Sequence, residues 1–121
     1  MSIKALHFPH DHTAPITEVT VDEKNAMNYY RYVQGGPVEG GYLNLGGLDV
    51  VCYVNSRYAA LPEDLVNERA TALFEVAGVG MYGGAIRGDS LLVRGAGPNG
   101  YERSLPADFA AFFLDTAHSE I

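Results

Sequence analysis

The first part of the chain alternates apolar and polar positions, and this alternation predicts a β-hairpin. Residues 16–21 place Ile, Val and Val against Thr, Glu and Thr, which is the two-residue period of a half-buried strand. Residues 3–8 predict a second strand, which ends at Pro9. The polar segment 10–15 joins the two strands, so we expect them to pair as neighbours.

Three more strands are predicted further along the chain. Residues 38–45 form one after Pro37, and residues 48–55 are apolar and β-branched on both faces. A strand with two apolar faces belongs in the interior of a sheet, so we expect 48–55 to be central. Residues 85–94 predict the last strand, with a bend at Gly88-Asp89.

The period of the apolar positions becomes helical after residue 21. Asp22 is a good N-cap and Gly35 a good C-terminal stop, which predicts a helix over 22–34. Its expected inner face consists of Ala26, Tyr29, Tyr30 and Val33. Tyr32 falls on the polar face, and because exposed tyrosines are common in binding surfaces it is a candidate contact residue.

Two later segments also have a helical period. One helix is predicted over 63–76, with an apolar face of Leu65, Val66, Ala70, Leu73, Phe74 and Val76. Another is predicted within 105–119, with Pro106 in its first turn and an inner face of Phe109, Phe112, Phe113 and Ala117. Together the elements predict one α+β domain over 1–121, a mainly antiparallel sheet with about three helices packed on one face.

The composition excludes some classes of protein but does not indicate an activity. The chain has 121 residues, a net charge of −7 and a sequence pI near 4.9. An acidic balance argues against direct nucleic-acid binding, and no apolar run reaches the roughly 18–20 residues of a membrane span. The first residues lack the pattern of a signal peptide. We therefore expect a cytoplasmic protein that does not contact a membrane.

The glycine motifs and the single cysteine do not indicate catalysis. Gly95-x-Gly97-x-x-Gly100 matches the dinucleotide fingerprint in form, but residues 101–106 separate it from the next helix, and too little chain follows for a βαβ unit. Cys52 lies inside the most apolar strand, without a cationic neighbour to activate the thiol. We expect an inert core cysteine, no cofactor and no catalytic residue.

Three histidines lie close together near the start of the chain. His7, His10 and His12 surround Asp11, and imidazole and carboxylate groups are ligands of transition metals. In an extended segment His10 and His12 point the same way. The alternative is a solvated polar turn, which we favour because the sequence has no second ligand cluster. We therefore expect no bound metal.

Arg69 is out of place on the apolar face of the second predicted helix. It lies one turn from Leu65 and Leu73, so its guanidinium must reach solvent or find a partner. An ion pair with Asp49 or Asp89, which adjoin core strands, is the interpretation we favour. The alternative is contact with an anion or another ligand.

Asn67 provides a different start for this helix. If the helix begins there, the asparagine is its N-cap and its side chain accepts the amide of Arg69 or Ala70. In that register Arg69 projects towards the sheet, near the expected strand carboxylates. Asn55, Asn67, Arg69 and Asp89 together are candidate residues of a ligand or partner site.

Short motifs in the middle of the chain carry a resemblance to a known family. In order they are Val33-Gln34-Gly35-Gly36, Val38-Glu39, Tyr53-Val54-Asn55, Leu61-Pro62, Asn67-x-Arg69-Ala70-Thr71-Ala72 and Ile86-x-Gly88-Asp89. This set resembles the family called "domain of unknown function 3846" over roughly residues 16–94. Ser56 stands where that family has an acidic residue, and the helix within 105–119 has no counterpart.

The resemblance implies a small accessory protein of bacteriophages, prophages or related mobile elements, located in the host cytoplasm. It implies no particular activity. We expect non-enzymatic binding and modulation of a host component, which is a protein or a small ligand. The first alternative is a ligand-sequestering protein or small enzyme with a pocket near Asn55, Asn67, Arg69 and Asp89. The second is an acidic mimic of nucleic acid, although the acids are spread along the chain. A homodimer is also expected, because tyrosines are abundant near the predicted turns.

Overall fold

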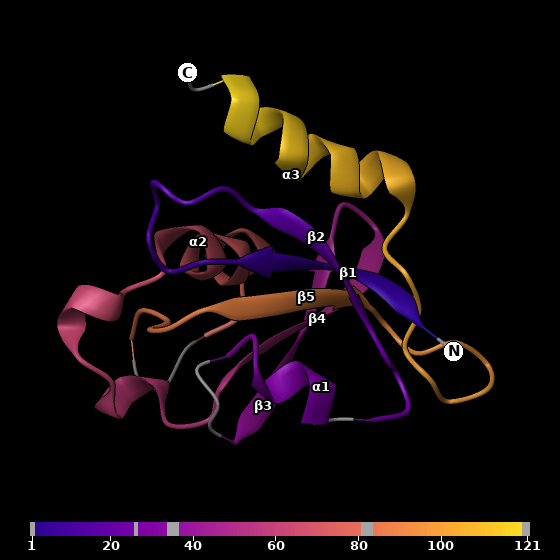
Figure 1. Ribbon diagram of the computed structural model, residues 1–121, viewed down its shortest axis with the longest axis horizontal. Helices are drawn as coiled ribbons and strands as arrows, with labels where there is room; N and C mark the ends of the chain where they lie inside the picture. Colours follow the sequence, from indigo (N-terminus) through magenta and orange to yellow (C-terminus); the bar gives the residue numbers. More distant parts are fainter. Residues whose placement is uncertain (1, 26, 34–36, 81–83, 120–121) are drawn as a thin grey trace.

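The chain folds around a five-stranded antiparallel sheet. The computed structural model describes residues 2–25, 27–33, 37–80 and 84–119, the last five by their backbone alone. The strands are β1 (Ile3–Phe8), β2 (Thr17–Val21), β3 (Val38–Leu45), β4 (Leu48–Asn55) and β5 (Ser90–Arg94). Their order in the sheet is β2-β1-β5-β4-β3 (Figure 1). The predicted α+β class with an antiparallel sheet is confirmed.

The strand predictions agree closely with the structure. β1 and β2 pair from Ile3↔Val21 to His7↔Thr17, so the predicted hairpin is confirmed. β4 lies between β3 and β5 and is buried on both faces along most of its length, as its composition predicts. The last strand begins only at Ser90, immediately after the predicted bend. It pairs with both β1 and β4 and therefore occupies the middle of the sheet.

Two glycine sites shape the β3–β4 hairpin. Gly46 and Gly47 connect the paired residues Leu45 and Leu48 with φ angles of 61° and 89°. Two consecutive positive φ values are the geometry of a two-residue hairpin turn, which side chains other than glycine adopt poorly. Gly41 lies further along β3, where a Cβ atom would come within 2.5 Å of the Phe74 ring. The missing side chain at Gly41 allows the helix that contains Phe74 to lie close to the strand.

The first helix is much shorter than predicted. α1 spans only Met27–Tyr30, although we expected a helix over 22–34. Asp22 caps a turn instead, because its carboxylate and carbonyl oxygens accept the amides of Lys24 and Asn25. Ala26 and the predicted stop at Gly35 lie outside the described residues.

The predicted second helix divides into two elements. Short 3-10 turns at Tyr58–Ala60 (η1) and Glu63–Leu65 (η2) precede the helix α2, which spans Glu68–Ala77. Asn67 is the N-cap of α2 and its side chain accepts the amide of Ala70, as the alternative start predicts. The last helix, α3, spans Ala107–Ser119, close to the predicted bounds.

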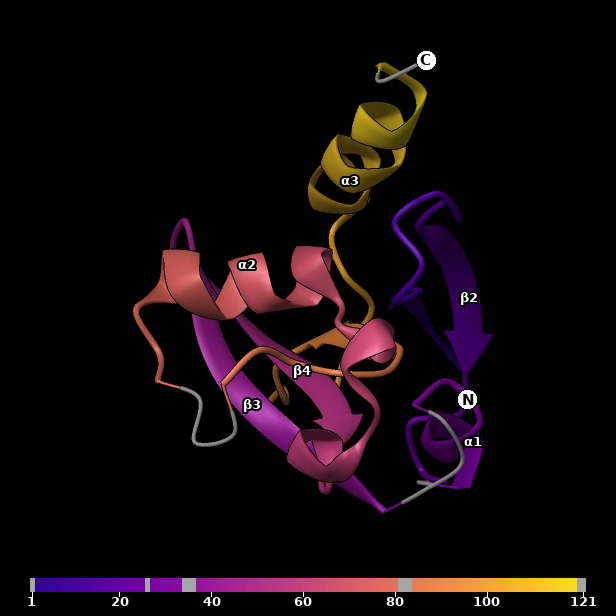
Figure 2. The same cartoon turned by 90° about the vertical axis from the view of Figure 1, so that its left-hand side faces the viewer.

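The helices cover both faces of the sheet, so the prediction that they pack on one face is wrong. α2 and α3 lie over one face, where residues such as Phe8, Cys52 and Phe74 form the larger core. The α1 segment covers the other face, where Tyr29 and Val33 pack on Val51 and its neighbours. Figure 2 shows α2 along one side of the strands and α3 rising beyond it. β4 and β5 carry apolar residues on both of their faces, so each face of the sheet needs its own covering core.

A shared carboxylate attaches the short α1 helix to the sheet. The hydroxyl of Tyr29 donates to Glu102 Oε1 at 2.8 Å, and the hydroxyl of Tyr53 on β4 donates to Glu102 Oε2 at 2.5 Å. Burial and these hydrogen bonds to a carboxylate raise the pKa of both tyrosines. Both phenols therefore stay neutral donors, and α1 is fixed although it is only one turn long.

Two predicted core positions are exposed. Val76 on α2 is 80% exposed and Phe112 on α3 is 67% exposed, although both were assigned to inner faces. α2 and α3 each present a wider apolar stripe than the sheet beneath them covers. The side chain of Ala117 lies outside the described part of the chain. Among the described residues, no helix combines the length and the apolar character that crossing a membrane requires.

Candidate functional site

Two histidines and an aspartate meet where β1 ends and β5 begins. The Nε2 atom of His7 lies 2.9 Å from Asp89 Oδ2, and the Nδ1 atom of His10 lies 2.8 Å from Asp89 Oδ1. The backbone amide of His10 donates to the same Oδ1 atom at 2.9 Å. This histidine cluster, His7, His10 and Asp89, forms because His7 pairs with Leu91 on β5, which places Asp89 beside the end of β1.

The carboxylate of Asp89 stays charged in this setting. Burial by itself would raise the pKa of Asp89, but the hydrogen bonds from His7 and from the amide and ring of His10 outweigh burial. The result is a pKa well below the ordinary value for aspartate. Both carboxylate oxygens already accept hydrogen bonds from protein groups, so Asp89 has a structural role at this point of the fold.

Asn67 joins three segments of the backbone. Its side-chain amide donates to the carbonyls of Phe8 at 2.8 Å and Gly88 at 3.1 Å, while its oxygen caps α2 through Ala70. The side chain is completely buried. Each of its polar atoms is therefore occupied inside the protein, and Asn67 cannot contact a ligand from solvent.

Arg69 bonds to main-chain oxygens. Its guanidinium donates to the carbonyls of Pro9 at 2.9 Å and Asp11 at 3.1 Å, which ties the first turn of α2 to the loop after β1. The two carboxylates expected as its partners have other contacts. Asp89 belongs to the histidine cluster, and Asp49 accepts a hydrogen bond from Asn44. The guanidinium of Arg69 is therefore bonded to main-chain carbonyls, where an ion pair with a strand carboxylate was expected.

Asn55 and Tyr32 lie on the α1 face of the sheet, near the histidine cluster. The Asn55 side chain donates to the Val33 carbonyl and accepts the amide of Arg57, and it is buried. The Tyr32 ring packs against the His7 ring, with 5.3 Å between centroids. The five candidate residues thus lie around one end of the sheet, but buried Asn55 and Asn67 bond within the protein.

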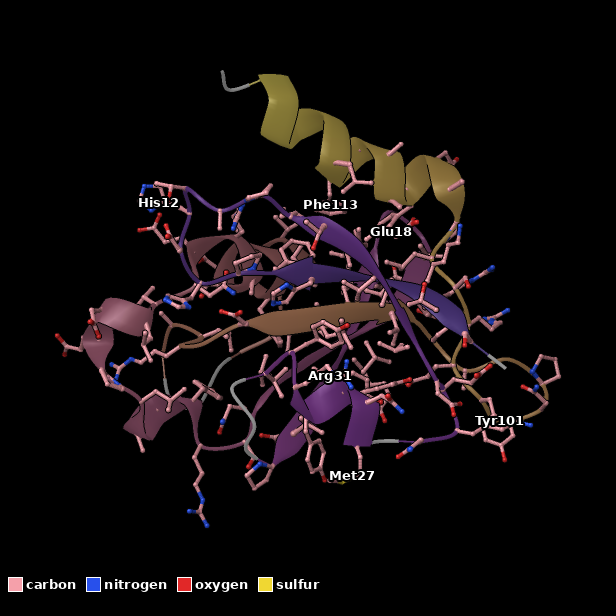
Figure 3. All side chains as sticks on the ribbon, viewed as in Figure 1. His12, Glu18, Met27, Arg31, Tyr101 and Phe113 are labelled. Carbon is pink, nitrogen blue, oxygen red and sulfur yellow. The ribbon has the colours of Figure 1, made fainter. Side chains whose placement is uncertain are left out.

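The two histidines that converge are not His10 and His12, the pair that the sequence spacing suggested. His7 and His10 converge on Asp89, whereas His12 is exposed in the loop (Figure 3). A shallow polar hollow of about 400 Å³ is lined by His10, His12, Asp64 and neighbouring residues. Within the part of the chain that the structure describes, no three His, Cys, Asp or Glu side chains are grouped to hold a metal ion. Cys52 is fully buried, as predicted, and burial raises the pKa of its thiol to about 12.

An apolar groove of about 720 Å³ runs between α2 and α3. Its floor includes Phe8 on β1 and Ile16 just before β2. Its walls are the stripe Ala72, Leu73 and Val76 on α2 and the stripe Phe109, Phe112 and Phe113 on α3. Phe113 lies beneath α3 in Figure 3, with its ring centroid 5.4 Å from that of Phe8. This volume is within the range of about 300–1,000 Å³ that is typical of ligand clefts.

Exposed acidic side chains occur on both helices that form the groove. Glu68 and Glu75 on α2 and Asp108 on α3 are exposed. None of the three lines the groove, and Glu68 lines the polar hollow with His10 and His12 instead. Arg69 is the cation among the lining residues, and its guanidinium is bonded to the β1 loop. Apart from Arg69, the side chains that line the groove are therefore apolar.

Of the five candidate residues from the sequence, Arg69 alone lines this groove, and the sequence analysis did not identify the groove itself. The signal was present in α2 and α3, whose apolar stripes contain more large residues than a small sheet can bury. A comparison with protein-family models, curated proteins and solved structures gives no match to this chain. The resemblance to "domain of unknown function 3846" therefore stays a prediction from the sequence motifs.

Proposed function

We propose that this chain is a non-enzymatic binding module that takes up a segment of a partner protein in the groove between α2 and α3. The observation that carries the proposal is the exposure of Val76 and Phe112 on opposite walls of one apolar cleft. Large apolar side chains facing each other across a cleft cost solvation free energy unless something covers them. A binding role accounts for their position.

The alternative of a ligand pocket near Asn55, Asn67, Arg69 and Asp89 has less support. Both oxygens of Asp89 accept hydrogen bonds from His7 and His10, and Asn67 is fully buried. A nucleophile or a general acid at this site would have to break contacts that hold β1, β5 and α2 together. The groove needs no such rearrangement to accept a partner.

The resemblance drawn from the sequence motifs gives the proposal a biological setting. An accessory protein of a phage or mobile element modulates its host by binding a host component, and a groove for a protein segment suits that role. The host partner is then a protein rather than a small ligand. The third possibility, a mimic of nucleic acid, relies on a net charge of −7 that is spread over the chain.

Selection from a displayed library of random peptides tests the proposal. Peptides of about 15 residues match the roughly 20 Å length of α3 if they are helical. We expect enriched peptides to bind the native chain and to lose at least about tenfold in affinity against Val76→Ser/Phe112→Ser. Both positions are exposed, so this variant should remain folded.

The matched control is Tyr42→Ser, which removes an exposed aromatic residue that does not line the groove. It should leave peptide affinity unchanged. Enriched peptides that bind Val76→Ser/Phe112→Ser as well as the native chain would contradict the groove as the binding site. Failure to enrich any peptide would count against a protein-binding module altogether.

A further inference from the structure

We infer that the outer edge of β3 pairs with the β3 strand of a second copy of this chain, which gives an antiparallel two-fold dimer. The inference goes beyond the proposed function, because it concerns another surface and another partner. Three features of β3 carry it: outward backbone groups, little protection of the edge, and side chains that complement a second copy of the same strand.

A row of backbone amides and carbonyls faces outward along β3, which stands at the end of the strand order (Figure 2). Leu45 and Leu48 close a two-residue turn and form a hydrogen-bonded pair, so every second residue of β3 before Leu45 bonds to β4. The Pro37 carbonyl, which accepts the amide of Ser56 at 2.8 Å, follows the same alternation. The residues in between direct their backbone groups away from the sheet, and they are Val38, Gly40, Tyr42 and Asn44. Among the described residues, no hydrogen bond reaches these outward groups, which are the groups that an added strand pairs with.

β3 has few of the features by which edge strands avoid pairing. Short length, charged side chains and proline within the strand are common forms of protection. β3 has eight residues without a proline, and Glu39 is its one charged residue. The strand at the opposite edge, β2, has five residues, and its Glu18 forms an ion pair with Lys4 at 3.8 Å. We therefore expect a further strand to pair at β3 rather than at β2.

The side chains in the middle of β3 favour a second copy as the added strand. Tyr42 is 78% exposed, and Gly40 lies two residues away on the same face of the sheet. A Cβ atom at Gly40 would lie 3.0 Å from Val51 and 3.3 Å from the Tyr53 ring, so these side chains border the position that the glycine leaves empty. In an antiparallel pair with its two-fold axis at Gly41, Tyr42 of each copy lies opposite Gly40 of the other. Both exposed rings then cover a glycine, and the outward backbone groups of both residues are paired.

The charges of β3 are compatible with this register. Glu39 of one copy lies opposite Leu43 of the other, so the charged residue of the strand does not face itself. Each chain carries a net charge of −7, and long-range repulsion therefore opposes association. Added salt screens that repulsion, so we expect salt to strengthen the dimer.

Sedimentation velocity of the chain between about 1 and 200 μM measures the association. One pair of strands is a small interface, so we expect a reversible dimer with a dissociation constant in the micromolar range. Raising the NaCl concentration from about 50 to 500 mM should lower this constant by at least about twofold. Where the dimer predominates, the amides of Gly40, Tyr42 and Asn44 should exchange with deuterium at least about fivefold more slowly than in the monomer. In a mixture of isotope-labelled and unlabelled chains, intermolecular NOEs should connect the Tyr42 ring with Gly40 of the other copy.

Variants at Tyr42 separate the backbone from the ring. Tyr42→Pro removes both the outward amide and the ring, and it should weaken the dimer at least about tenfold. Edge strands tolerate proline where the amide faces solvent, and circular dichroism verifies that the variant is folded. Tyr42→Ser keeps the amide and should weaken the dimer about threefold or more, whereas Tyr42→Phe keeps the ring and should change it by less than about twofold. The matched control is Tyr101→Ser, which removes an exposed tyrosine outside β3 and should have no effect.

Several results would overturn the inference. A chain that is monomeric at about 200 μM does not pair its β3 edges at a concentration where such an interface should form. A dimer that folded Tyr42→Pro and Tyr42→Ser leave intact uses another surface. Dissociation of the dimer in Val76→Ser/Phe112→Ser, with Tyr42→Ser unaffected, would place the second copy in the groove between α2 and α3. Intermolecular NOEs that join the two Tyr42 rings, or that leave β3 out, would exclude the pairing about Gly41.

Discussion

Single side chains hold the end of the sheet where β1, β5 and α2 meet. Asn67 illustrates this, because it caps α2 and also donates to carbonyls on the two segments beside it. The N-cap role was visible in the sequence, since asparagine before a helical period is a recognisable start signal. The two other contacts depend on which strands become neighbours, and no local pattern contains that information.

Replacing Asn67 with alanine should destabilise the chain strongly. Loss of the cap costs about 1 kcal/mol, and the carbonyls left without a donor cost about 1–3 kcal/mol more. We therefore expect Asn67→Ala to lower the free energy of unfolding by roughly 2–4 kcal/mol in urea titrations. Asn99→Ala, at an exposed turn, should cost no more than about 1 kcal/mol. Equal losses in the two variants would show that the bridge by Asn67 contributes little.

Asp89 should make stability depend on pH in the acid range. Its folded-state pKa lies below the value of about 3.9 in an unfolded chain, so its contribution is present above about pH 4 and is lost as pH falls further. We expect Asp89→Asn to cost about 2 kcal/mol at neutral pH, because hydrogen bonds to a charged group are worth about 1.5–3 kcal/mol. The difference from the native chain should shrink at about pH 3. A difference that stays constant between these pH values, in urea titrations, would contradict the charged cluster.

Between elements, the first turn of α2 depends on Arg69 to hold the loop after β1. Arg69→Ala should lower the melting temperature by about 4 °C, since a loss of about 1 kcal/mol shifts a domain of roughly 120 residues by about that much. The charge-matched control is the exposed residue Arg57, for which Arg57→Ala should shift the melt by less than about 2 °C. An unchanged melt for Arg69→Ala, measured by circular dichroism, would show that its hydrogen bonds to Pro9 and Asp11 carry no stability.

Strands were predicted better than helices in this chain. The predicted bounds of β1, β3 and β4 agree with the structure. These strands are short, and Pro9, Pro37 and the Gly46-Gly47 turn mark where they begin or end. The helix predicted over 22–34 failed because Asp22 and Asn25 side chains bond to nearby amides and favour turns. Propensity alone gave no means to decide between a cap that begins a helix and a side chain that closes a turn.

The candidate site also depends on contacts between residues that are far apart in the sequence, which local patterns do not predict. The candidate residues Asn55, Asp89 and Tyr32 do lie near one another, but His7 completes the arrangement through strand pairing between β1 and β5. The groove was missed for a related reason. A helical period identifies an apolar stripe, yet it does not say how much of that stripe the sheet will cover, as Val76 and Phe112 show.

For the whole molecule, most structural polar contacts lie apart from the exposed apolar surface, and Arg69 belongs to both regions. The histidine cluster and Asn67 tie the end of the sheet together, while the groove between α2 and α3 leaves Val76 and Phe112 open to solvent. This division separates stability from binding. Variants at the end of the sheet should therefore change unfolding, and variants on the groove walls should change partner affinity.

Amide chemical shifts in a titration with the tightest peptide from the library selection test this division most directly. We expect the largest changes on α2 around Ala72–Val76 and on α3 around Phe109–Phe113, with His7, His10 and Asp89 almost unaffected. Changes centred on the histidine cluster, with the helix walls unaffected, would contradict the assignment of the binding site to the groove.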